Sequence, residues 1–271
     1  MKNKFSFYLI AVAMGILLGI GVIRIESLFM IESKESSSLY NSEIYIIVKS
    51  KTITELVNET SREVYKGPGP STGKIAYITI DDGPTKYTNQ ILDILNENNI
   101  KATFFLIDSN MKKRPEVVKR IVKNGHGVGF HSVSHDRKIL YSSPENTLNE
   151  FNTCKETFSN ITGKESNLVR LPYGSKPYAP KESIDILLKN NYLIWDWNLD
   201  TEDWRGSSDN IVSNILYYGR DKSKLIVLMH EKEQTIEALE STIKVLKERG
   251  YTILPITEEV QSYNYWNKNM Q

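Results

Sequence analysis

The chain has little cysteine and little histidine. Among its 271 residues there are one cysteine, Cys154, and four histidines. A single cysteine excludes an intrachain disulfide framework and a cysteine-based zinc finger. Cys154 lies among polar residues of a helix-like stretch, and we interpret it as an ordinary small residue. Where the few histidines stand is therefore the more informative question.

An excess of charge of either sign is also missing. The 34 lysines and arginines nearly balance the 33 aspartates and glutamates, which gives a formal net charge of +1. Such a chain carries no mark of nucleic-acid binding or of broad adsorption to membranes. Its length and its 40% content of hydrophobic residues suit one medium globular domain with additional segments.

The N-terminus carries a long uncharged run, at residues 5–23, with Lys2 and Lys4 ahead of it. The run is about long enough to cross the roughly 30 Å hydrocarbon core of a bilayer. Positive charge ahead of it favours a cytoplasmic N-terminus and an extracytoplasmic remainder. A cleavable signal peptide is the alternative, although the Ala-x-Ala at residues 11–13 lies inside the run. We expect residues 1–24 to be an uncleaved single-pass signal anchor in the cell membrane, or the protein to be secreted if they are cleaved.

Residues 25–73 differ in composition from the rest of the chain. They contain a serine-rich segment and, at residues 66–73, a loop rich in glycine and proline. We interpret them as an extracytoplasmic stalk that partly packs on the domain, with a short strand at 44–48 and a short helix at 52–65. The main domain is expected at 74–262, with a tail at 263–271.

From Lys74 onward, apolar runs alternate with helical patterns. The expected strands are 75–80, 102–106, 127–130, 168–170, 192–197, 225–229 and 251–254, and the expected helices are 88–98, 115–124, 144–158, 181–190, 207–218 and 235–249. Seven strands that alternate with helices predict an α/β fold with a parallel sheet. A closed or nearly closed (β/α) barrel is the most economical arrangement, and an open doubly wound sheet is the runner-up.

Polar clusters come directly after five of these runs. They are Asp81 and Asp82, His131 and His135, Arg170 to Tyr173, Asp200 to Trp204, and His230. In parallel α/β folds, functional residues gather at the carboxyl ends of strands. The clusters are therefore expected to meet at one edge of the sheet. His126 stands in the turn before a strand, on the far side, and we expect it to be structural.

Each cluster has a simpler interpretation when it is taken alone. Asp81 and Asp82 lie in a sequence typical of a turn, and a histidine pair four residues apart is often incidental. Together, however, Asp82, His131 and His135 form a two-histidine, one-carboxylate set suited to a divalent metal. Arg170 alone would be a surface arginine, and His230 alone a surface residue at a strand end. The tryptophans at 195, 197 and 204, interspersed with acids, are either an apolar wall of the site or plain core.

Taken together, the clusters resemble a known family. They are similar, in order, to the five motifs of the polysaccharide deacetylases, the NodB-homology enzymes of carbohydrate esterase family 4, over about residues 74–256: Asp81-Asp82-Gly83-Pro84, His131-x-x-x-His135, Arg170-x-Pro172-Tyr173-Gly174, Asp200-x-x-Asp203-Trp204 and Leu228-x-His230. The resemblance implies a distorted (β/α) barrel with fewer than eight regular strands. Two positions depart from the family pattern: Leu171 replaces a frequent proline, and Ile80 a frequent phenylalanine. Neither removes a functional group.

The resemblance also implies a role for each motif residue. Asp82, His131 and His135 would hold a divalent metal, commonly zinc, with cobalt or other ions as alternatives. Asp81 would be the catalytic base and His230 the general acid.

Further residues would support these groups. Arg170 would position Asp81, and Asp203 would orient His230. Tyr173 would offer a backbone N–H to the oxyanion hole and contact the substrate. Trp204 and Leu228 would line the pocket for the acetyl methyl group.

The implied function is metal-dependent removal of N-acetyl groups, with release of acetate, from a cell-wall or surface polysaccharide. The expected substrates are the N-acetylglucosamine units of peptidoglycan or of a chitin-like glycan. An O-acetyl esterase acting on a glycan such as acetylxylan is one alternative, and a non-catalytic glycan-binding wall protein is another. The sequence has no His-Glu-x-x-His peptidase motif. A monomer with no nucleic-acid partner is expected.

Overall fold

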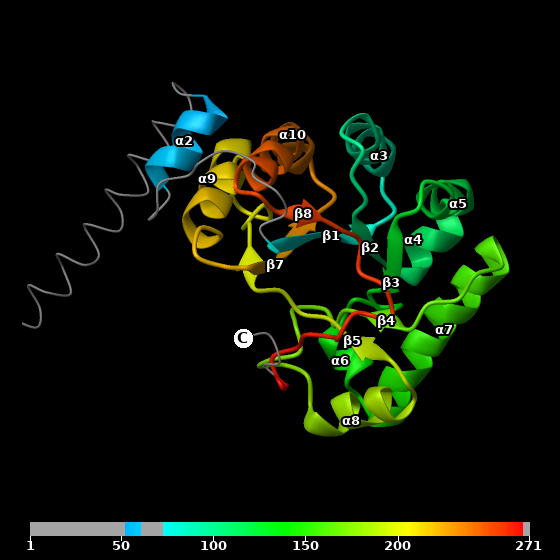
Figure 1. Ribbon diagram of the computed structural model, residues 1–271. Helices are drawn as coiled ribbons and strands as arrows, with labels where there is room; N and C mark the ends of the chain where they lie inside the picture. The colour runs from blue at the N-terminus through cyan, green and yellow to red at the C-terminus, as the bar shows by residue number, and fades with distance from the viewer. Residues whose placement is uncertain (1–51, 61–72, 268–271) are drawn as a thin grey trace, which may run out of the picture. The chain divides into compact units, whose positions relative to one another are not determined.

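The structure is a computed structural model that describes residues 52–60 and 73–267 (Figure 1). The predicted anchor at 1–24 and the predicted strand at 44–48 lie outside these residues and stay predictions. Within the described part of the chain, no helix combines the length and the apolar character that a membrane span requires.

One parallel sheet organises the domain. Its strands are β1 (Ile75–Gly83), β2 (Thr103–Leu106), β3 (Gly127–Phe130), β4 (Leu168–Val169), β5 (Leu193–Ile194), β6 (Leu199–Asp200), β7 (Lys224–His230) and β8 (Thr252–Ile253). Seven of them adopt the order β5-β4-β3-β2-β1-β7-β6, and β8 pairs with the start of β1. All pairings are parallel, which confirms the predicted α/β class.

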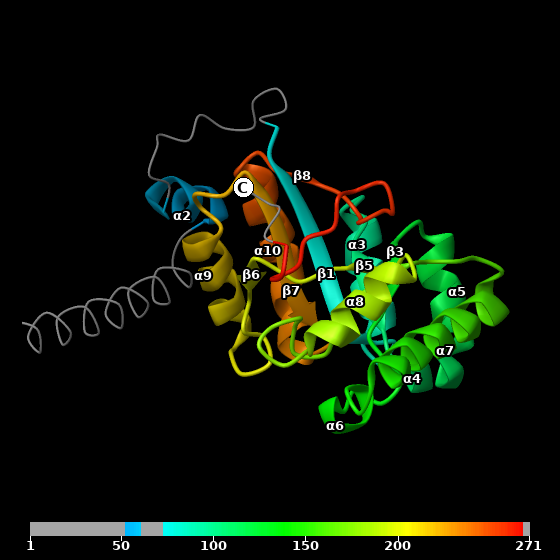
Figure 2. The same cartoon turned by 90° about the horizontal axis from the view of Figure 1, so that it is seen from below.

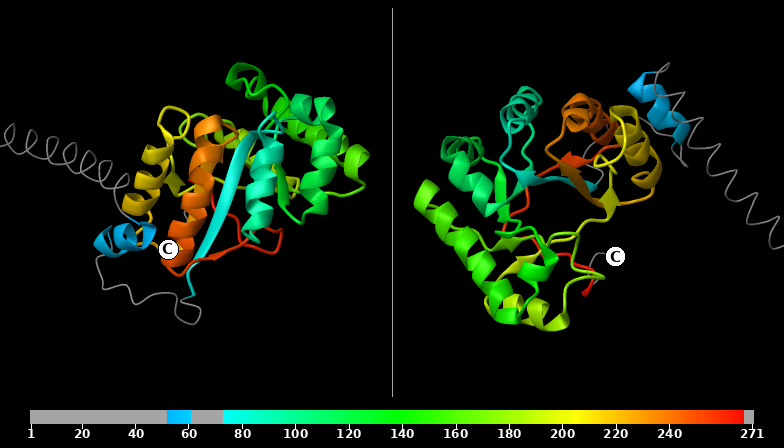
Figure 3. Two further views of the ribbon diagram at one scale, coloured as in Figure 1. Left: turned by 90° about the horizontal axis from the view of Figure 1, so that it is seen from above. Right: turned by 180° about the vertical axis from the view of Figure 1, so that it is seen from behind.

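Helices cover the outer side of this sheet, as the view along the strands shows (Figure 1). The described helices are α2 (Ile53–Thr60), α3 (Thr88–Glu97), α4 (Asp108–Lys113), α5 (Pro115–Lys123), α6 (Arg137–Leu140), α7 (Pro144–Thr162), α8 (Lys181–Lys189), α9 (Ser208–Tyr218) and α10 (Glu233–Glu248). Of these, α2 packs against α9 and α10, and α6 packs against α7. In the view from above, α10 and α3 flank β1 (Figure 3). Local sequence sets the ends: Ser143 caps α7 ahead of Pro144, and Gly163 ends it in a left-handed conformation.

The side chains of β1 alternate between the two faces of the sheet. Because successive side chains of a strand point to opposite faces, Ile78 and Ile80 face the outer helices, and both are fully buried. Tyr77, Thr79 and Asp81 face inward. Inside, Tyr77 packs edge-on against Trp195, within a core cluster completed by Phe105, Leu168, Ile226 and Ile256. Side chains therefore fill the inner face of the sheet on the side of Asp81 that lies toward the start of β1.

The predicted distorted barrel is confirmed in part: the parallel strands form a curled sheet, but the sheet, as far as the structure describes it, is not closed or nearly closed. Among the described residues the sheet ends at β5 and β6, which do not pair, so it forms a curled half-barrel (Figure 2). The predicted strand at 192–197 contains only the two-residue β5, and the equally short β6 was not predicted. Such short strands leave few hydrogen-bonding groups with which to close the ring.

The C-terminal segment lies beside this opening. The Asp196 N–H donates to the Tyr263 carbonyl over 2.8 Å, and the Tyr265 N–H donates to Asp196 Oδ2 over 2.7 Å. The Trp266 indole donates to the Ser175 carbonyl over 2.9 Å. Residues assigned to a tail thus contact the loop after β4.

Part of the predicted stalk packs on the domain. Helix α2 lies within the expected helix at 52–65, and its Leu56 and Val57 are buried. Arg249, beyond α10, donates to Thr60 Oγ1 over 2.7 Å and to carbonyls at the end of α9. This arginine ties α2 to both helices. The domain boundaries at 24, 73 and 262 stay predictions.

Candidate active site

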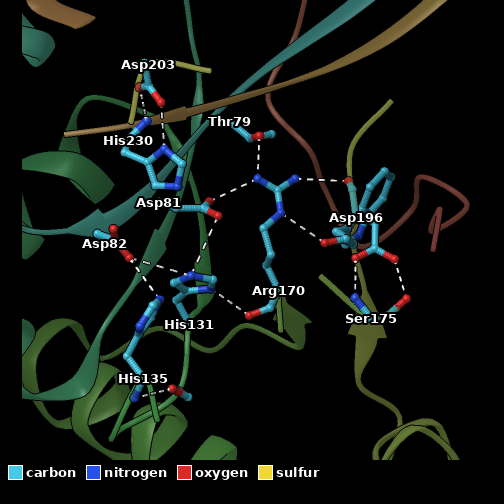
Figure 4. A network of polar contacts seen from close by, with 12 residues as sticks. Thr79, Asp81, Asp82, His131, His135, Arg170, Ser175, Asp196, Asp203 and His230 are labelled. Atoms are coloured by element: carbon cyan, nitrogen blue, oxygen red, sulfur yellow. Dashed lines mark hydrogen bonds and ion pairs between the residues drawn. The ribbon is translucent and has the colours of Figure 1, made fainter. Parts of the chain in front are cut away.

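The predicted clusters meet at the carboxyl edge of the sheet. Asp81 and Asp82 end β1, His131 comes directly after β3, Arg170 directly after β4, and His230 ends β7. Asp81 and His230 are direct partners in the parallel register of β1 and β7. Figure 4 shows these side chains converging around Asp81. The register, rather than proximity in sequence, brings them together.

Asp82, His131 and His135 offer three ligand atoms that lie within 4.8 Å of one another. Asp82 Oδ1 is 3.4 Å from His135 Nε2 and 3.7 Å from His131 Nε2. Asp82 and His135 both have positive φ angles, of 70° and 50°. The two histidines therefore come together through a turn and not through a helix.

These residues fit a divalent cation. His131 Nδ1 lies 2.8 Å from the Arg170 carbonyl; because a carbonyl only accepts, Nδ1 carries the proton and Nε2 keeps its lone pair. Asp82 Oδ1 is buried, and no described residue donates a hydrogen bond to it. Burial, and to a smaller extent the charge of His131, lowers the pKa of His135, which favours the neutral, ligating form. Two imidazoles and one carboxylate are a donor set typical of zinc.

Asp81 is held apart from this set. It is buried, and its Oδ1 accepts a hydrogen bond of 3.0 Å from Arg170 Nη1. The same Nη1 donates to Thr79 Oγ1, and Nε and Nη2 donate to the carbonyls of Trp195 and Asp196. Asp81 Oδ2 lies 3.8 Å from His131 Nε2. The fully buried arginine therefore fixes one oxygen of Asp81 and leaves the other toward the candidate ligands Asp82, His131 and His135, the metal-ligand set (Figure 4).

His230 forms a charged pair with Asp203. Its Nδ1 lies 2.7 Å from Asp203 Oδ1, and its backbone N–H donates to Asp203 Oδ2. Thr235 Oγ1 also donates to this buried carboxylate. Burial alone would lower the pKa of His230, but the Asp203 hydrogen bond and the charges of Asp203, Asp81 and Asp82 outweigh it and raise that pKa to about 9. The imidazole is therefore kept protonated near neutral pH.

Three further predicted residues surround this centre. The Tyr173 ring is 53% exposed and lies 5.2 Å from the His135 ring, centroid to centroid. Its backbone has a positive φ of 66°, and no described residue accepts a hydrogen bond from its N–H. Trp204 is 54% exposed, whereas Leu228 is buried within β7. Their predicted roles toward substrate stay predictions.

The aromatic and acidic stretch around β5 divides between core and site. Trp195 is fully buried in the inner core, so for this residue the plain-core interpretation is confirmed. Asp196 is buried too, and it accepts hydrogen bonds from the Ser175 N–H and hydroxyl. It shapes the loop that carries Tyr173. No pattern in the sequence links Ser175 to Asp196.

Glu231 was also missed, although it stands next to His230. Its Oε2 accepts hydrogen bonds of 2.6 to 2.7 Å from the Thr85 N–H, the Thr85 hydroxyl and the Thr88 hydroxyl. A Cβ at Gly83 would lie only 2.3 Å from its Oε1, so a larger residue there would displace the Glu231 carboxylate. Glu231 thus joins the turn after Asp82 to the end of β7. Its adjacency to His230 was the signal available.

His126 lies where the sequence placed it, at the amino end of β3. It is 7% exposed, and its Nδ1 accepts the Ala102 N–H over 3.1 Å. Its ring packs edge-on against Phe104. Burial, and to a smaller extent the charge of Lys101, lowers its pKa to about 4. The structural role predicted for it agrees with these contacts.

Comparison with known proteins agrees with this geometry. Residues 69–193 match the family model described as polysaccharide deacetylase. The putative polysaccharide deacetylase YheN of Bacillus subtilis is 35% identical over 198 residues, which cover 68% of this chain and 70% of that protein. A peptidoglycan-N-acetylglucosamine deacetylase of Bacillus cereus is 34% identical over 237 residues, covering 82% of this chain and 86% of the relative.

Solved structures share the fold. The crystal structure of the polysaccharide deacetylase Bc1974 from Bacillus cereus matches with a TM-score of 0.69 and 36% identity, covering 73% of this chain and all of that one. The motifs, their convergence at one edge of the sheet and these likenesses lead to one conclusion. The chain belongs to the polysaccharide deacetylase family and is a hydrolase of amide bonds, as are the relatives named peptidoglycan-N-acetylglucosamine deacetylase.

Proposed function

We propose that the protein removes N-acetyl groups from N-acetylglucosamine units of a cell-wall glycan and releases acetate. One observation carries the proposal: Asp81, fixed by Arg170, and His230, paired with Asp203, lie on neighbouring strands beside Asp82, His131 and His135. A base, an acid and a cation site at one edge are what amide hydrolysis needs. The name of the Bacillus cereus relative supports peptidoglycan as the substrate.

Asp82, His131 and His135 would hold the divalent metal, with zinc as the proposed ion and cobalt as an alternative. When bound, the cation supplies positive charge that polarises a carbonyl group and makes a water molecule more acidic. His131 is oriented for this role by the Arg170 carbonyl. The same arginine thus positions a metal ligand through its backbone and Asp81 through its side chain.

Asp81 acts as the base in this proposal. Its Oδ1 is engaged by Arg170, so Oδ2 is the oxygen that accepts a proton from the attacking water. The Tyr173 N–H, which no described residue engages, donates to the negative oxygen that develops on the acetyl carbon. Loss of such a donor typically costs about 10²–10³ in rate.

His230 acts as the general acid. Its Nδ1 is bonded to Asp203, so the proton for the departing amine comes from Nε2. An amide needs this donation because a free amide anion is a very poor leaving group. Trp204 and Leu228 are proposed to border the acetyl methyl group. The side chain of Trp204 is open to solvent, as access by a polymer requires.

The protein is further proposed to be a membrane-anchored monomer. Residues 1–24 would hold it in the cell membrane with residues 74–262 outside the cytoplasm. The uncharged run at 5–23 and the lysines ahead of it support this topology. An extracytoplasmic position would place the catalytic edge beside the wall polymer.

Acetate release by the full chain in detergent tests the function. Peptidoglycan, chitooligosaccharides and acetylated xylan would be compared, with chelator and with zinc or cobalt added back. Chelator-sensitive release from peptidoglycan or chitooligosaccharides is the expected result. Release from acetylated xylan alone would replace the proposal by an O-acetyl esterase, and no release from any glycan despite bound metal would refute deacetylation of these substrates.

A further inference from the structure

Arg137, at the start of α6, stacks on two tyrosine rings at the catalytic edge. Its guanidinium carbon lies 4.0 Å from the Tyr178 ring centroid and 5.1 Å from the Tyr173 ring centroid. The two rings meet edge-on at 6.2 Å. Aromatic faces hold a guanidinium in place through its positive charge without engaging the N–H groups in its plane. Arg137 is therefore ordered while its donors stay available.

This cluster adjoins the metal-ligand set. The Tyr173 ring contacts both Arg137 and the ring of His135, so one aromatic ring separates the guanidinium from a proposed metal ligand. Tyr173 and Tyr178 are 53% and 48% exposed, and Arg137 is exposed as well. A polymer whose acetylated sugar reaches the metal-ligand set would therefore pass the guanidinium with an adjoining unit.

The charge of Arg137 is not balanced locally. In the part of the chain that the structure describes, no carboxylate forms an ion pair with it, and no acceptor takes a hydrogen bond from its side chain. Asp136, its neighbour, is used to cap α6 through the Lys138 N–H. An ordered cation with open donors beside a catalytic centre points to an anionic group of the substrate.

Arg205 provides the contrast. It also stacks on an aromatic ring near the site, 5.0 Å from the Trp204 centroid, but it forms an ion pair with Glu202. Its charge is thus already balanced by the protein. Of these two stacked arginines, Arg205 has one nitrogen engaged by a carboxylate, whereas no described residue forms an ion pair with Arg137.

We propose that Arg137 binds a carboxylate on the sugar unit adjoining the one that is deacetylated. The planar guanidinium matches a carboxylate with two parallel hydrogen bonds. The enzyme would then prefer acidic glycans, in which every second sugar carries a carboxyl group, over neutral chains of the same length. This specificity rests on the proposed deacetylase function and narrows its substrate class.

Two chemically matched glycans test the proposal. Peptidoglycan glycan strands stripped of their peptides by an amidase keep a free carboxylate on each lactyl group. Half of the preparation is amidated with carbodiimide and ammonia, which removes the charge but keeps length and N-acetylation. Binding of both strands to the zinc-loaded full chain is measured by calorimetry, and acetate release by kcat/KM.

The wild type should bind the acidic strands about three- to tenfold more tightly, the range expected for an exposed, charge-assisted pair. The preference should shrink in high salt. Arg137→Gln should bring the ratio close to one, and Arg137→Lys should keep only part of it, because it retains charge without the planar fork. Arg205→Gln is the matched control and should keep the wild-type ratio. Metal content, measured for every variant, should not change.

A wild-type ratio near one, or a wild-type ratio kept by Arg137→Gln, would overturn the proposal. Because the binding ratio needs no turnover, it tests Arg137 even if acetate is not released. Absence of chelator-sensitive release with an intact binding ratio would instead count against the deacetylase function alone.

Discussion

His126 and His230 lie at opposite edges of one sheet, and their pKa values move in opposite directions. Burial by itself would lower the pKa of both histidines. No carboxylate of the described residues stabilises the charged form of His126, which contacts the Ala102 N–H and the Phe104 ring near the charge of Lys101, and its pKa falls to about 4. His230 meets Asp203, Asp81 and Asp82, and its pKa rises to about 9.

The difference shows that partners, and not depth, separate a structural histidine from a reactive one. At the amino edge the imidazole is a neutral acceptor that satisfies one backbone N–H. At the carboxyl edge three carboxylates make the protonated form the stable one. Substitutions on either side of the sheet can break or sharpen this contrast.

Asp81→Asn should have the largest effect. The amide keeps the shape of the side chain but cannot accept a proton, so acetate release should fall by about 10²–10⁴, the usual contribution of a general base. Metal content should stay at the wild-type level, because Asp82, His131 and His135 are unchanged. Kinetics and metal analysis of the same preparation check this, and a lost metal would refute the division of roles between Asp81 and Asp82.

Asp203→Asn should weaken the contrast itself. Activity requires protonated His230. In the wild type, activity is therefore present below the pKa of His230 and is lost as pH rises through that value. Removing the adjoining negative charge lets burial dominate and moves this alkaline limb to lower pH. The pH profile of kcat for both proteins measures the shift. An unchanged limb would mean that another group donates the proton.

His126→Asn should affect stability and not acetate release. The hydrogen bond to the Ala102 N–H is lost or weakened, and leaving a buried donor unsatisfied costs about 1–3 kcal/mol. Because the folded pKa of about 4 lies below the ordinary 6.5, the stability contributed by neutral His126 is full above pH 6.5 and is lost as pH falls toward 4. Denaturant unfolding at pH 7 and pH 5 should show a smaller acid loss in the variant. Equal losses of stability in both proteins would show that His126 does not contribute to the loss at acid pH.

Chemical labelling of Cys154 should give the smallest effect: the thiol should not react in the folded protein. Cys154 is buried like His126, and burial raises the pKa of its thiol well above the ordinary value, outweighing the Asp108 backbone hydrogen bond and the charge of Lys112. The thiolate is the reactive form, so a maleimide should leave the native protein unlabelled and label it fully in denaturant. Rapid labelling of the native protein would show that α7 opens readily.

The sequence predicts most of the candidate site because parallel strands impose a common edge. Asp81, His131, Arg170 and His230 each stand at the end of an apolar run, and the register of β1 with its neighbours places them together. Long strands such as β1 and β7 carry a clear apolar pattern. The two-residue β6 carries none, which is why the opening of the sheet was not foreseen.

Contacts between distant loops were the other omission. Ser175 with Asp196, and Glu231 with Thr85, join separate segments of the chain through two hydrogen bonds each. Neither pair has a periodicity that a strand or helix would impose. The role of residues 263–267 beside the β4 loop was hidden for the same reason.

Four residues of the catalytic edge, Asp82, Ser132, His135 and Tyr173, adopt positive φ angles although none is glycine. Such a conformation costs about 1–3 kcal/mol for each residue and persists only where surrounding contacts impose it. Placing the same residue types at the strand ends of another protein would therefore not reproduce this site. A designer would have to copy the loops, together with Glu231 and the C-terminal residues that brace them.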